Sequence, residues 1–303
     1  MNKKILITGG TGLIGTYLKD YLPSAIYVGS KDFNLLIEKD IKLMFKEIKP
    51  NIVIHLAALV GGVHHNIEEP VKYFEENILM NTFVLKESYK NNVENFLGTL
   101  SSCIYPDDIK EYPIKESELL NGAPHKDLFS YSYAKRCMAI HIDMYNKKFK
   151  TKYNYIIPCN LYGEFDKFDS IKGHFVGALI EKIIVAKKKN KNKITLFGDG
   201  TPYRQFMHAK DVAKIIYIMI SKKKFFNMNI ATNENYSIDY IAKIALEACD
   251  ATNISIKYDK SKPNGQMRKD IEISNMVKHF PEFTAIKLKD GIRDIYRKRM
   301  KLK

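Results

Sequence analysis

The sequence has few cysteines and no long hydrophobic run. Its cysteines lie far apart and lack the spacing of a disulfide framework; they are Cys103, Cys137, Cys159 and Cys249. The basic start Met1-Asn2-Lys3-Lys4 resembles the first part of a signal peptide, but the apolar run after it ends in glycines. No stretch reaches the ~18 apolar residues of a membrane span. We therefore expect a cytoplasmic protein without membrane association.

Acidic residues are outnumbered, since 49 Lys and Arg face 34 Asp and Glu and give a formal net charge of +15. Such an excess suits an anionic partner, either a nucleic acid or a ligand with several phosphates. Lysine is abundant along the whole chain, however, and the basic run 187–193 is typical of a solvated loop, so nucleic-acid binding is not expected. No constellation of Cys or carboxylate residues joins His64 and His65 at ligand spacing. We interpret these two as loop or pocket-wall residues and expect no metal.

A glycine-rich turn follows the first apolar run. Residues 4–8 are β-rich, and Gly9-Gly10-Thr11-Gly12-Leu13-Ile14-Gly15 then opens a helical pattern. Glycines allow a tight turn and close approach of a pyrophosphate, and the helix start offers free N–H groups and a positive dipole. This order predicts a dinucleotide site with contacts at Gly9, Thr11, Gly12, Leu13, Ile14 and Gly15.

The second expected strand, residues 25–28, ends before Ser30, Lys31 and Asp32. A cation and a small hydroxyl at this position suit the 2′-phosphate of NADP, whereas an acid suits the ribose of NAD. Ser30 and Lys31 favour NADP(H). Asp32 leaves two alternatives open, a ribose contact or a turn-closing or helix-capping acid.

Strands and helices alternate along the first half of the chain. The amphipathic stretch 41–48 precedes an apolar strand, residues 51–55, which is followed by Leu56 and the small residues Ala57 and Ala58. This predicts an α/β, Rossmann-type doubly wound parallel sheet, with ligand at the carboxyl ends of its strands. After residue 164 we expect a loop to 173, helices from 175, 211 and 237, and strands at 194–197 and 226–231. We predict a dinucleotide-binding domain of residues 1–163 and 203–233 and a smaller C-terminal α/β substrate lobe of residues 164–202 and 234–303.

Tyr131 and Lys135 stand four residues apart in a helical pattern, so both lie on one face. A neighbouring ammonium favours the ionised phenol, whose free pKa of ~10 is too high for efficient proton exchange at neutral pH. Ser101 follows the apolar run 96–100 and can hold a substrate carbonyl. Together the three residues suit hydride transfer to or from a carbonyl.

Several longer motifs extend this pattern over nearly the whole chain. They are Ser101-Ser102-Cys103-Ile104-Tyr105-Pro106, Pro158-Cys159-Asn160-Leu161-Tyr162-Gly163, Gly173-His174, Phe197-Gly198-Asp199-Gly200-Thr201-Pro202 and Arg204-Gln205-Phe206. With the glycine loop and the Tyr-Lys pair, the sequence resembles the extended short-chain dehydrogenase/reductase family, and within it the GDP-L-fucose synthase group. Sugar-nucleotide dehydratases of this fold typically carry Asp-Glu where Cys103-Ile104 stands, which counts against dehydration.

The resemblance implies NADPH-dependent reduction of the C4 ketone of a GDP-4-keto-6-deoxy-sugar, hexose or heptose, in a homodimer. It leaves open whether C3, C5, both or neither are epimerised; Cys103 and His174 would exchange the protons next to the ketone. Further cofactor contacts would be Leu56, Ala57, Ala58, Tyr131, Lys135, Pro158, Asn160, Leu161 and His174. Substrate contacts would be Ser102, Cys103, Asn160, Lys182, Phe197, Arg204 and Lys269.

Two residues depart from the group, Asn264 where Asp is common and Ile37 where many relatives have Asp. Two other functions remain open. One is an NAD-retaining 4-epimerase of nucleotide sugars. The other is a basic nucleic-acid-binding protein on a Rossmann scaffold.

Overall fold

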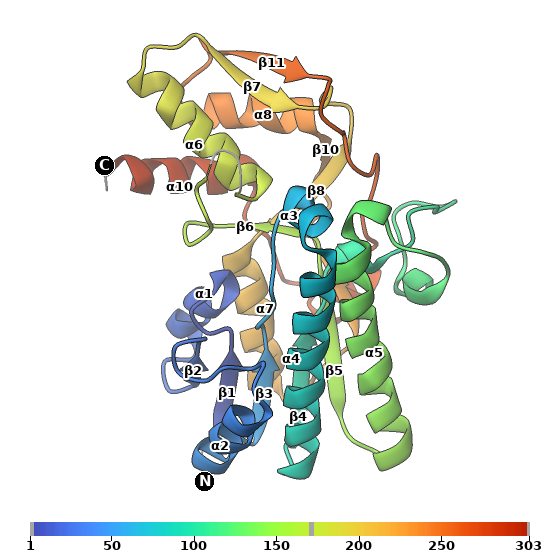
Figure 1. Ribbon diagram of the computed structural model, residues 1–303. Coiled ribbons are helices and arrows are strands. Elements are labelled where there is room, and N and C mark those ends of the chain that lie inside the picture. The colour runs from blue at the N-terminus through green and yellow to red at the C-terminus, as the bar shows by residue number, and fades with distance from the viewer. Residues whose placement is uncertain (1–2, 170–172, 302–303) are drawn as a thin grey trace.

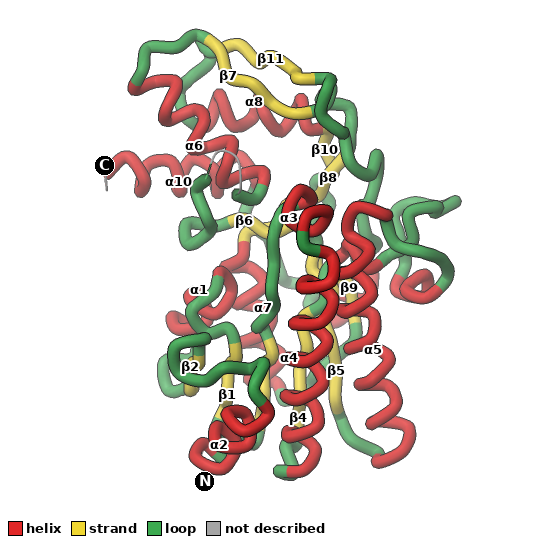
Figure 2. The backbone as a smooth tube through the Cα atoms, viewed as in Figure 1, coloured by secondary structure: helices red, strands yellow, loops and turns green. Residues whose placement is uncertain are grey.

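The computed structural model describes residues 3–169 and 173–301 and is built around a six-stranded sheet (Figures 1 and 2). All neighbouring strands in it run parallel. Their order across the sheet is β2 (Ile26–Val28), β1 (Ile5–Thr8), β3 (Ile52–His55), β4 (Asn95–Thr99), β5 (Tyr153–Pro158) and β9 (Met228–Ile230). The Rossmann-type parallel sheet predicted from the sequence is therefore confirmed, including the late strand that returns to it.

Helices cover both faces of this sheet because its strands are apolar on both sides. On one face α4 (Pro70–Lys90) packs between α2 (Glu38–Ile48) and α5 (Phe129–Phe149). On the other face α1 (Leu13–Tyr21) packs against α7 (Ala209–Lys222). Figure 1 shows α4 and α5 in front of the sheet and α7 behind it.

A second apolar core lies beyond the carboxyl ends of the main strands. Its helices are α6 (Phe175–Lys188), α8 (Ile238–Ala248) and α10 (Leu288–Lys301). Its strands form two small sheets, one of β10 (Asn235–Ser237), β8 (Tyr203–His208) and β6 (Asn160–Tyr162), the other of β11 (Ser255–Asp259) and β7 (Lys193–Phe197). Ile271, Met276 and Phe280 return to the first core. The domain limits given above stay a prediction.

Short helical segments complete the described chain. They are α3 (Val63–Glu68), α9 (Ser274–His279) and the 3-10 turns η1 (Ser102–Ile104), η2 (Glu116–Leu120) and η3 (Lys126–Leu128). Of the two interpretations of His64 and His65, the loop is wrong, because the backbone there is helix α3, which Gly62 starts in an extended conformation. The pocket-wall interpretation stays a prediction. No helix in the described ranges is both long and apolar enough to cross a bilayer.

Candidate active site

The glycine loop forms a narrow backbone cradle between β1 and α1. Gly9 has a φ of +68°, and a Cβ added there would stand 2.7 Å from the backbone nitrogen of Ala57. A Cβ on Gly15 would stand 2.6 Å from the carbonyl oxygen of Gly9. Gly12 starts α1, and the loop donates from Gly10 N–H to the Val28 carbonyl at 2.9 Å. The loop thus offers a helix start and a surface that only glycines leave open.

The other predicted cofactor residues lie at strand ends beside this cradle. Leu56, Ala57 and Ala58 follow β3, and the Leu56 N–H donates to the Thr8 carbonyl at 3.1 Å. Pro158 ends β5, and Asn160 and Leu161 lie on β6. Leu56 and Pro158 thus mark the carboxyl ends of two parallel strands, where ligands bind in such sheets, and β6 continues the chain just after the end of β5.

The turn after β2 separates the two alternatives for Asp32. Its carboxylate accepts a hydrogen bond from the Gly29 N–H at 2.7 Å and so closes the turn itself. Ser30 and Lys31 are both exposed in the same turn. The geometry favours the turn-closing role of Asp32 and leaves the two residues before it facing solvent.

Helix α5 holds the turn that carries Ser101 and Cys103. The Ser132 hydroxyl donates to the Cys103 carbonyl at 2.9 Å, and the Arg136 guanidinium donates to the Ile104 carbonyl. The Ser101 hydroxyl accepts from the Cys103 N–H at 3.4 Å. Ser102 is buried. The residues that follow β4 are therefore fixed to the helix that carries Tyr131 and Lys135.

Tyr131 and Lys135 face one another, with the Lys135 ammonium 5.9 Å from the centroid of the Tyr131 ring. That ammonium donates to the Thr99 carbonyl at 2.8 Å, at the end of β4. The expected lowering of the phenol pKa is wrong for the protein alone. Burial raises the pKa of Tyr131, with a smaller contribution from Cys103, and burial lowers the pKa of Lys135 to about 7. Desolvation outweighs the neighbouring ammonium, so the phenol keeps its proton.

Two cations surround the thiol of Cys103. The Lys269 Nζ donates to the Cys103 Sγ at 3.6 Å, although the two residues are far apart in sequence. Burial opposes ionisation of this thiol, but Lys269, the Ser101 hydroxyl and Arg204 together lower its pKa below its usual value. Burial lowers the pKa of Arg204 to about 10, which leaves it charged at neutral pH. Cys103, Lys269 and Arg204 thus form one cluster, as the sequence predicted only in part.

His174 lies at the start of α6 and pairs with Asp166. Its Nδ1 is 2.8 Å from the Asp166 carboxylate, whose side chain is only 4% exposed. The hydrogen bond to Asp166 raises the pKa of His174, and the charge of the same carboxylate adds to the effect, against burial. The pair leaves the Nε2 side of the ring as the part of His174 that can serve a ligand.

Phe197 on β7 and Lys182 on α6 lie close together, in the part of the molecule built around the second apolar core. The Lys182 ammonium lies 5.2 Å from the centroid of the Phe197 ring and donates to the Thr195 carbonyl at 2.8 Å. Phe197 is 53% exposed, which leaves a ring face available for stacking. Asn264, which departs from the group pattern, accepts from the Asp199 N–H at 2.8 Å and closes the turn after β7.

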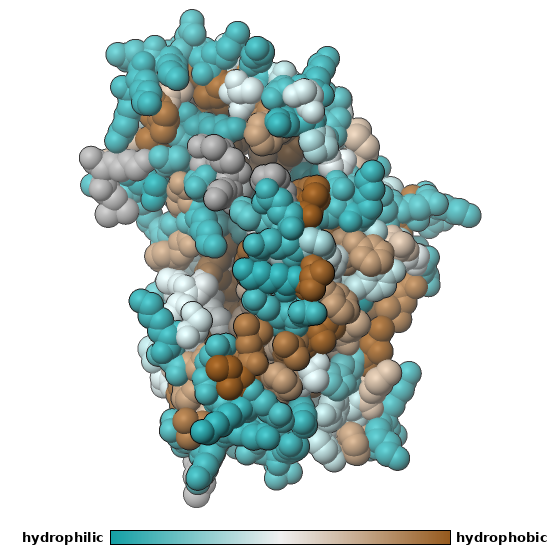
Figure 3. All heavy atoms as spheres, viewed as in Figure 1, coloured by the Kyte–Doolittle hydropathy of each residue, from teal (hydrophilic) through white to brown (hydrophobic). Residues whose placement is uncertain are grey.

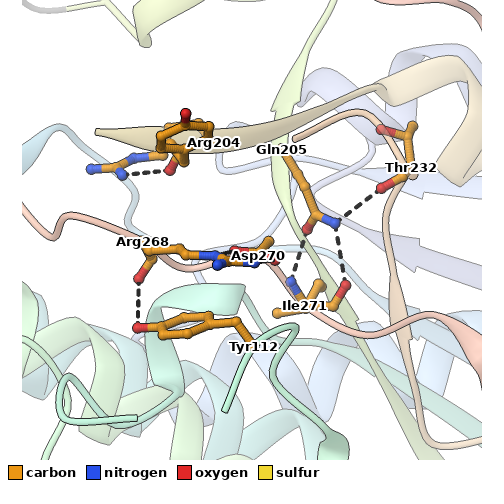
Figure 4. Close-up of polar contacts among 8 residues, drawn as sticks. Tyr112, Arg204, Gln205, Thr232, Arg268, Asp270 and Ile271 are labelled. Carbon is orange, nitrogen blue, oxygen red and sulfur yellow. Dashed lines mark hydrogen bonds and ion pairs between the residues drawn. The ribbon is translucent and has the colours of Figure 1, made fainter. Parts of the chain in front are cut away.

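Sequence reasoning missed the residues that hold these side chains in place. Asp166 lay in a stretch expected to be an irregular loop, and Asp270 next to Lys269 carried no motif signal. Gln205 belongs to the motif Arg204-Gln205-Phe206 without a predicted role, yet its buried amide binds two chain segments (Figure 4). These residues differ from other polar residues of the chain mainly in being buried, and burial cannot be read from the order of residues.

Known proteins share the sequence pattern and the fold of this chain. The model of the NAD dependent epimerase/dehydratase family matches residues 5–231. The chain belongs to this family. It is 35% identical to a GDP-L-colitose synthase of Yersinia pseudotuberculosis over 95% of each chain. It is 32% identical to a GDP-L-fucose synthase of Dictyostelium discoideum, over 96% of this chain and 93% of that one.

Among solved members of the family, a GDP-L-fucose synthetase from Naegleria fowleri bound to NADP superimposes with a TM-score of 0.89. It is 30% identical, and the match covers 99% of this chain and 93% of that chain. The family resemblance and the Rossmann-type fold expected from the motifs are therefore confirmed.

Proposed function

We propose that this protein reduces the C4 ketone of a GDP-linked 4-keto-6-deoxy-sugar with NADPH. The observation that carries the proposal is the convergence of Ser101, Tyr131 and Lys135 at the end of β4, at the same carboxyl edge of the sheet as the glycine cradle. Two relatives, named as synthases of GDP-L-colitose and GDP-L-fucose, support the same substrate class.

The residues present fit a dinucleotide. A side chain at Gly9 or Gly15 would fill the cradle, so the loop is shaped for close approach of another group. Ser30 and Lys31 would hold the 2′-phosphate, and Lys135 the ribose and nicotinamide end. NADPH, when bound, supplies the hydride for C4.

The side chains of the chain itself handle the proton. Ser101 hydrogen-bonds the C4 oxygen, and Tyr131 gives its phenolic proton to that oxygen as the alcohol forms. Because burial raises the pKa of Tyr131, the phenol is protonated before the reaction. Lys135 next to the resulting phenolate stabilises it until solvent returns the proton.

We also propose proton exchange at C3 or C5, by Cys103 and His174. The 4-keto group acidifies the hydrogens on both carbons. Cys103 as thiolate, next to Lys269, takes a proton from one face, and His174 as imidazolium, held by Asp166, returns one to the other face. Each exchange leaves a neutral thiol and a neutral imidazole, which solvent resets. This step inverts the carbon that it acts on.

Solvent exchange without NADPH tests the epimerase half. Wild-type enzyme incubated in D₂O with a GDP-4-keto-6-deoxy-sugar should incorporate deuterium at C3, C5 or both, followed by NMR. Cys103→Ser should abolish the incorporation while reduction of an already epimerised substrate with NADPH continues. Reduction without any exchange in wild type would make the protein a plain C4 reductase.

A panel of GDP- and dTDP-linked 4-keto hexoses and heptoses, each offered with NADPH, identifies the sugar. Loss of NADPH absorbance reports reduction. Turnover by the purified protein without added NADPH, through tightly bound NAD, would favour the 4-epimerase instead. Tight polynucleotide binding with a steep salt dependence and no turnover would favour the nucleic-acid alternative.

We also propose a homodimer in the cytoplasm. Helices α4 and α5 carry exposed apolar side chains, among them Val71, Phe74, Met144 and Phe149. Figure 3 shows hydrophobic residues at the surface in the region of these two helices. A paired copy would bury them. Light scattering should give twice the chain mass of 35.0 kDa, and Met144→Asp should lower the measured mass.

The proposed location is the cytoplasm, because a reducing compartment keeps the Cys103 thiol available. Cell fractionation tests this location.

A further inference from the structure

Residues 264–271, which we call the strap, connect the second apolar core to the first and pass next to Cys103. On one side the strap is bound to β8: the Tyr203 N–H donates to the Met267 carbonyl at 2.9 Å. The buried Gln205 side chain accepts from the Ile271 N–H at 2.9 Å and donates to the Ile271 carbonyl at 3.2 Å. The same amide donates to the Thr232 carbonyl at 3.0 Å, as Figure 4 shows.

The other side of the strap is bound to the segment that follows η1. The Arg268 guanidinium makes two hydrogen bonds to the Asp270 carboxylate, at 2.6 and 3.0 Å, and stacks over the Tyr112 ring at 4.7 Å. The Tyr112 hydroxyl donates to the Arg268 carbonyl at 3.1 Å (Figure 4). The Ile114 N–H donates to the Asp270 carbonyl at 2.8 Å. The backbone is thus fixed immediately before and after Lys269.

Between these anchors the Lys269 side chain is buried and extends to Cys103. Its exposed fraction is 8%, and its Nζ lies 3.6 Å from the Sγ atom. A buried ammonium is costly unless a partner compensates it. The adjacent carboxylate of Asp270 is engaged by Arg268, so it does not draw Lys269 away from the thiol.

We propose that the strap is a positioning device that holds the Lys269 ammonium against Cys103 and thereby keeps this half-buried thiol ionisable. The inference rests on the proposed role of Cys103 in proton removal. Besides Lys269, the groups that face the thiol are the Arg204 guanidinium, the Ser101 hydroxyl and the Tyr131 phenol. Lys269 is the cation in direct contact, so its loss has the largest effect.

The rate at which iodoacetamide alkylates Cys103 measures the thiolate directly, because the thiolate is the reactive form. The full-length protein is treated between pH 6 and 10, and the Cys103 peptide is quantified by mass spectrometry. Lys269→Met should shift the pH profile upward and slow alkylation near pH 7 by about tenfold, since one pKa unit changes the thiolate fraction tenfold. Lys269→Arg keeps the cation and should lie nearer to wild type than to Lys269→Met.

Lys262→Met is the matched control, because Lys262 is exposed just before the strap and its loss changes the net charge equally. It should leave the profile unchanged. Asp270→Asn keeps the Lys269 side chain but weakens the anchor that holds it at Cys103, and should shift the profile less, in the same direction. It also serves if thermal denaturation shows that Lys269→Met does not fold.

An unchanged Cys103 profile in folded Lys269→Met, or in Asp270→Asn if the former does not fold, overturns the proposal. An equal shift in Lys262→Met overturns it too, because general charge would then explain the effect. The outcome is independent of turnover. If wild type never exchanges deuterium but Lys269→Met shifts the alkylation profile, the epimerase proposal fails and the strap proposal stands.

Discussion

The cofactor end and the substrate end of the site are assembled in different ways. At the cofactor end, Gly9, Ala57 and Ser101 each lie within two residues of the carboxyl end of a parallel strand, so the sheet alone brings them together. At the substrate end, Cys103 meets Lys269 across 166 positions, and Gln205 meets Ile271 across 66. One end depends on local backbone shape, and the other on contacts between distant segments.

This difference has a functional consequence. In the proposed mechanism, reduction needs the cofactor end together with Tyr131, whereas proton exchange on carbon needs Cys103, the strap and the His174–Asp166 pair. If the two ends are separable, substitutions at one should leave the chemistry of the other intact. The predictions below test this separation, from the largest expected effect to the smallest.

The largest effect is expected for Tyr131→Phe. Loss of the proton donor should lower the rate of ketone reduction by about 10²- to 10⁴-fold, while deuterium exchange in D₂O continues. Steady-state NADPH oxidation and NMR measure the two reactions. Tyr133→Phe, on the same helix, is the control and should keep most activity. Near-normal reduction by Tyr131→Phe would exclude Tyr131 as the acid.

A buried histidine predicts a pH dependence of stability at the cofactor end. The His55 Nδ1 lies 2.7 Å from the Thr8 hydroxyl, and its Nε2 lies 3.0 Å from the Asn81 side-chain oxygen. Burial, with the charge of Lys135, lowers the pKa of His55 from 6.5 to about 3. Between these values the unfolded chain binds a proton that the folded protein does not.

The free energy of unfolding should therefore decrease as the pH falls from 6.5 toward 3, with a contribution from His55 of up to about 1.4 kcal/mol per pH unit. This stabilisation is fully present above pH 6.5. Denaturant unfolding of wild type and His55→Asn at several pH values isolates it. The two curves should converge toward low pH, and parallel curves would contradict the prediction.

Motifs predicted the fold and the cofactor end because both follow from local order. The alternation of strands and helices gave the parallel sheet, and the glycines after β1 gave the cradle. The direction of the Tyr131 pKa shift was wrong, because i, i+4 spacing reports the nearby charge but not the burial that opposes it. The partner of Cys103 and the carboxylate behind His174 could not be predicted, since neither has a fixed spacing from its partner.

A smaller effect is expected for Gly9→Ala at the cofactor end. The left-handed backbone alone costs a residue with a Cβ about 1–2 kcal/mol, and the added Cβ would stand 2.7 Å from the Ala57 nitrogen. Thermal denaturation should show a lower melting temperature and a loss of stabilisation by added NADPH. Gly62→Ala, where an added Cβ meets nothing within 4 Å, should leave both unchanged. Equal melting temperatures and equal stabilisation by NADPH in the two variants would contradict the proposal that the glycine loop holds the cofactor.

The smallest effect is expected for Lys31→Ala, which tests the choice between NADP and NAD. Lys31 is exposed, so its attraction to a 2′-phosphate is screened by water and salt. We expect the preference of kcat/KM for NADPH over NADH to fall by several-fold at low ionic strength, and by less at high salt, with little change for NADH itself. Lys39→Ala, another exposed lysine nearby in sequence, should change neither value. If wild type uses NADH as well as NADPH, the interpretation of Ser30 and Lys31 is wrong, because residues that bind the 2′-phosphate should favour the cofactor that carries it.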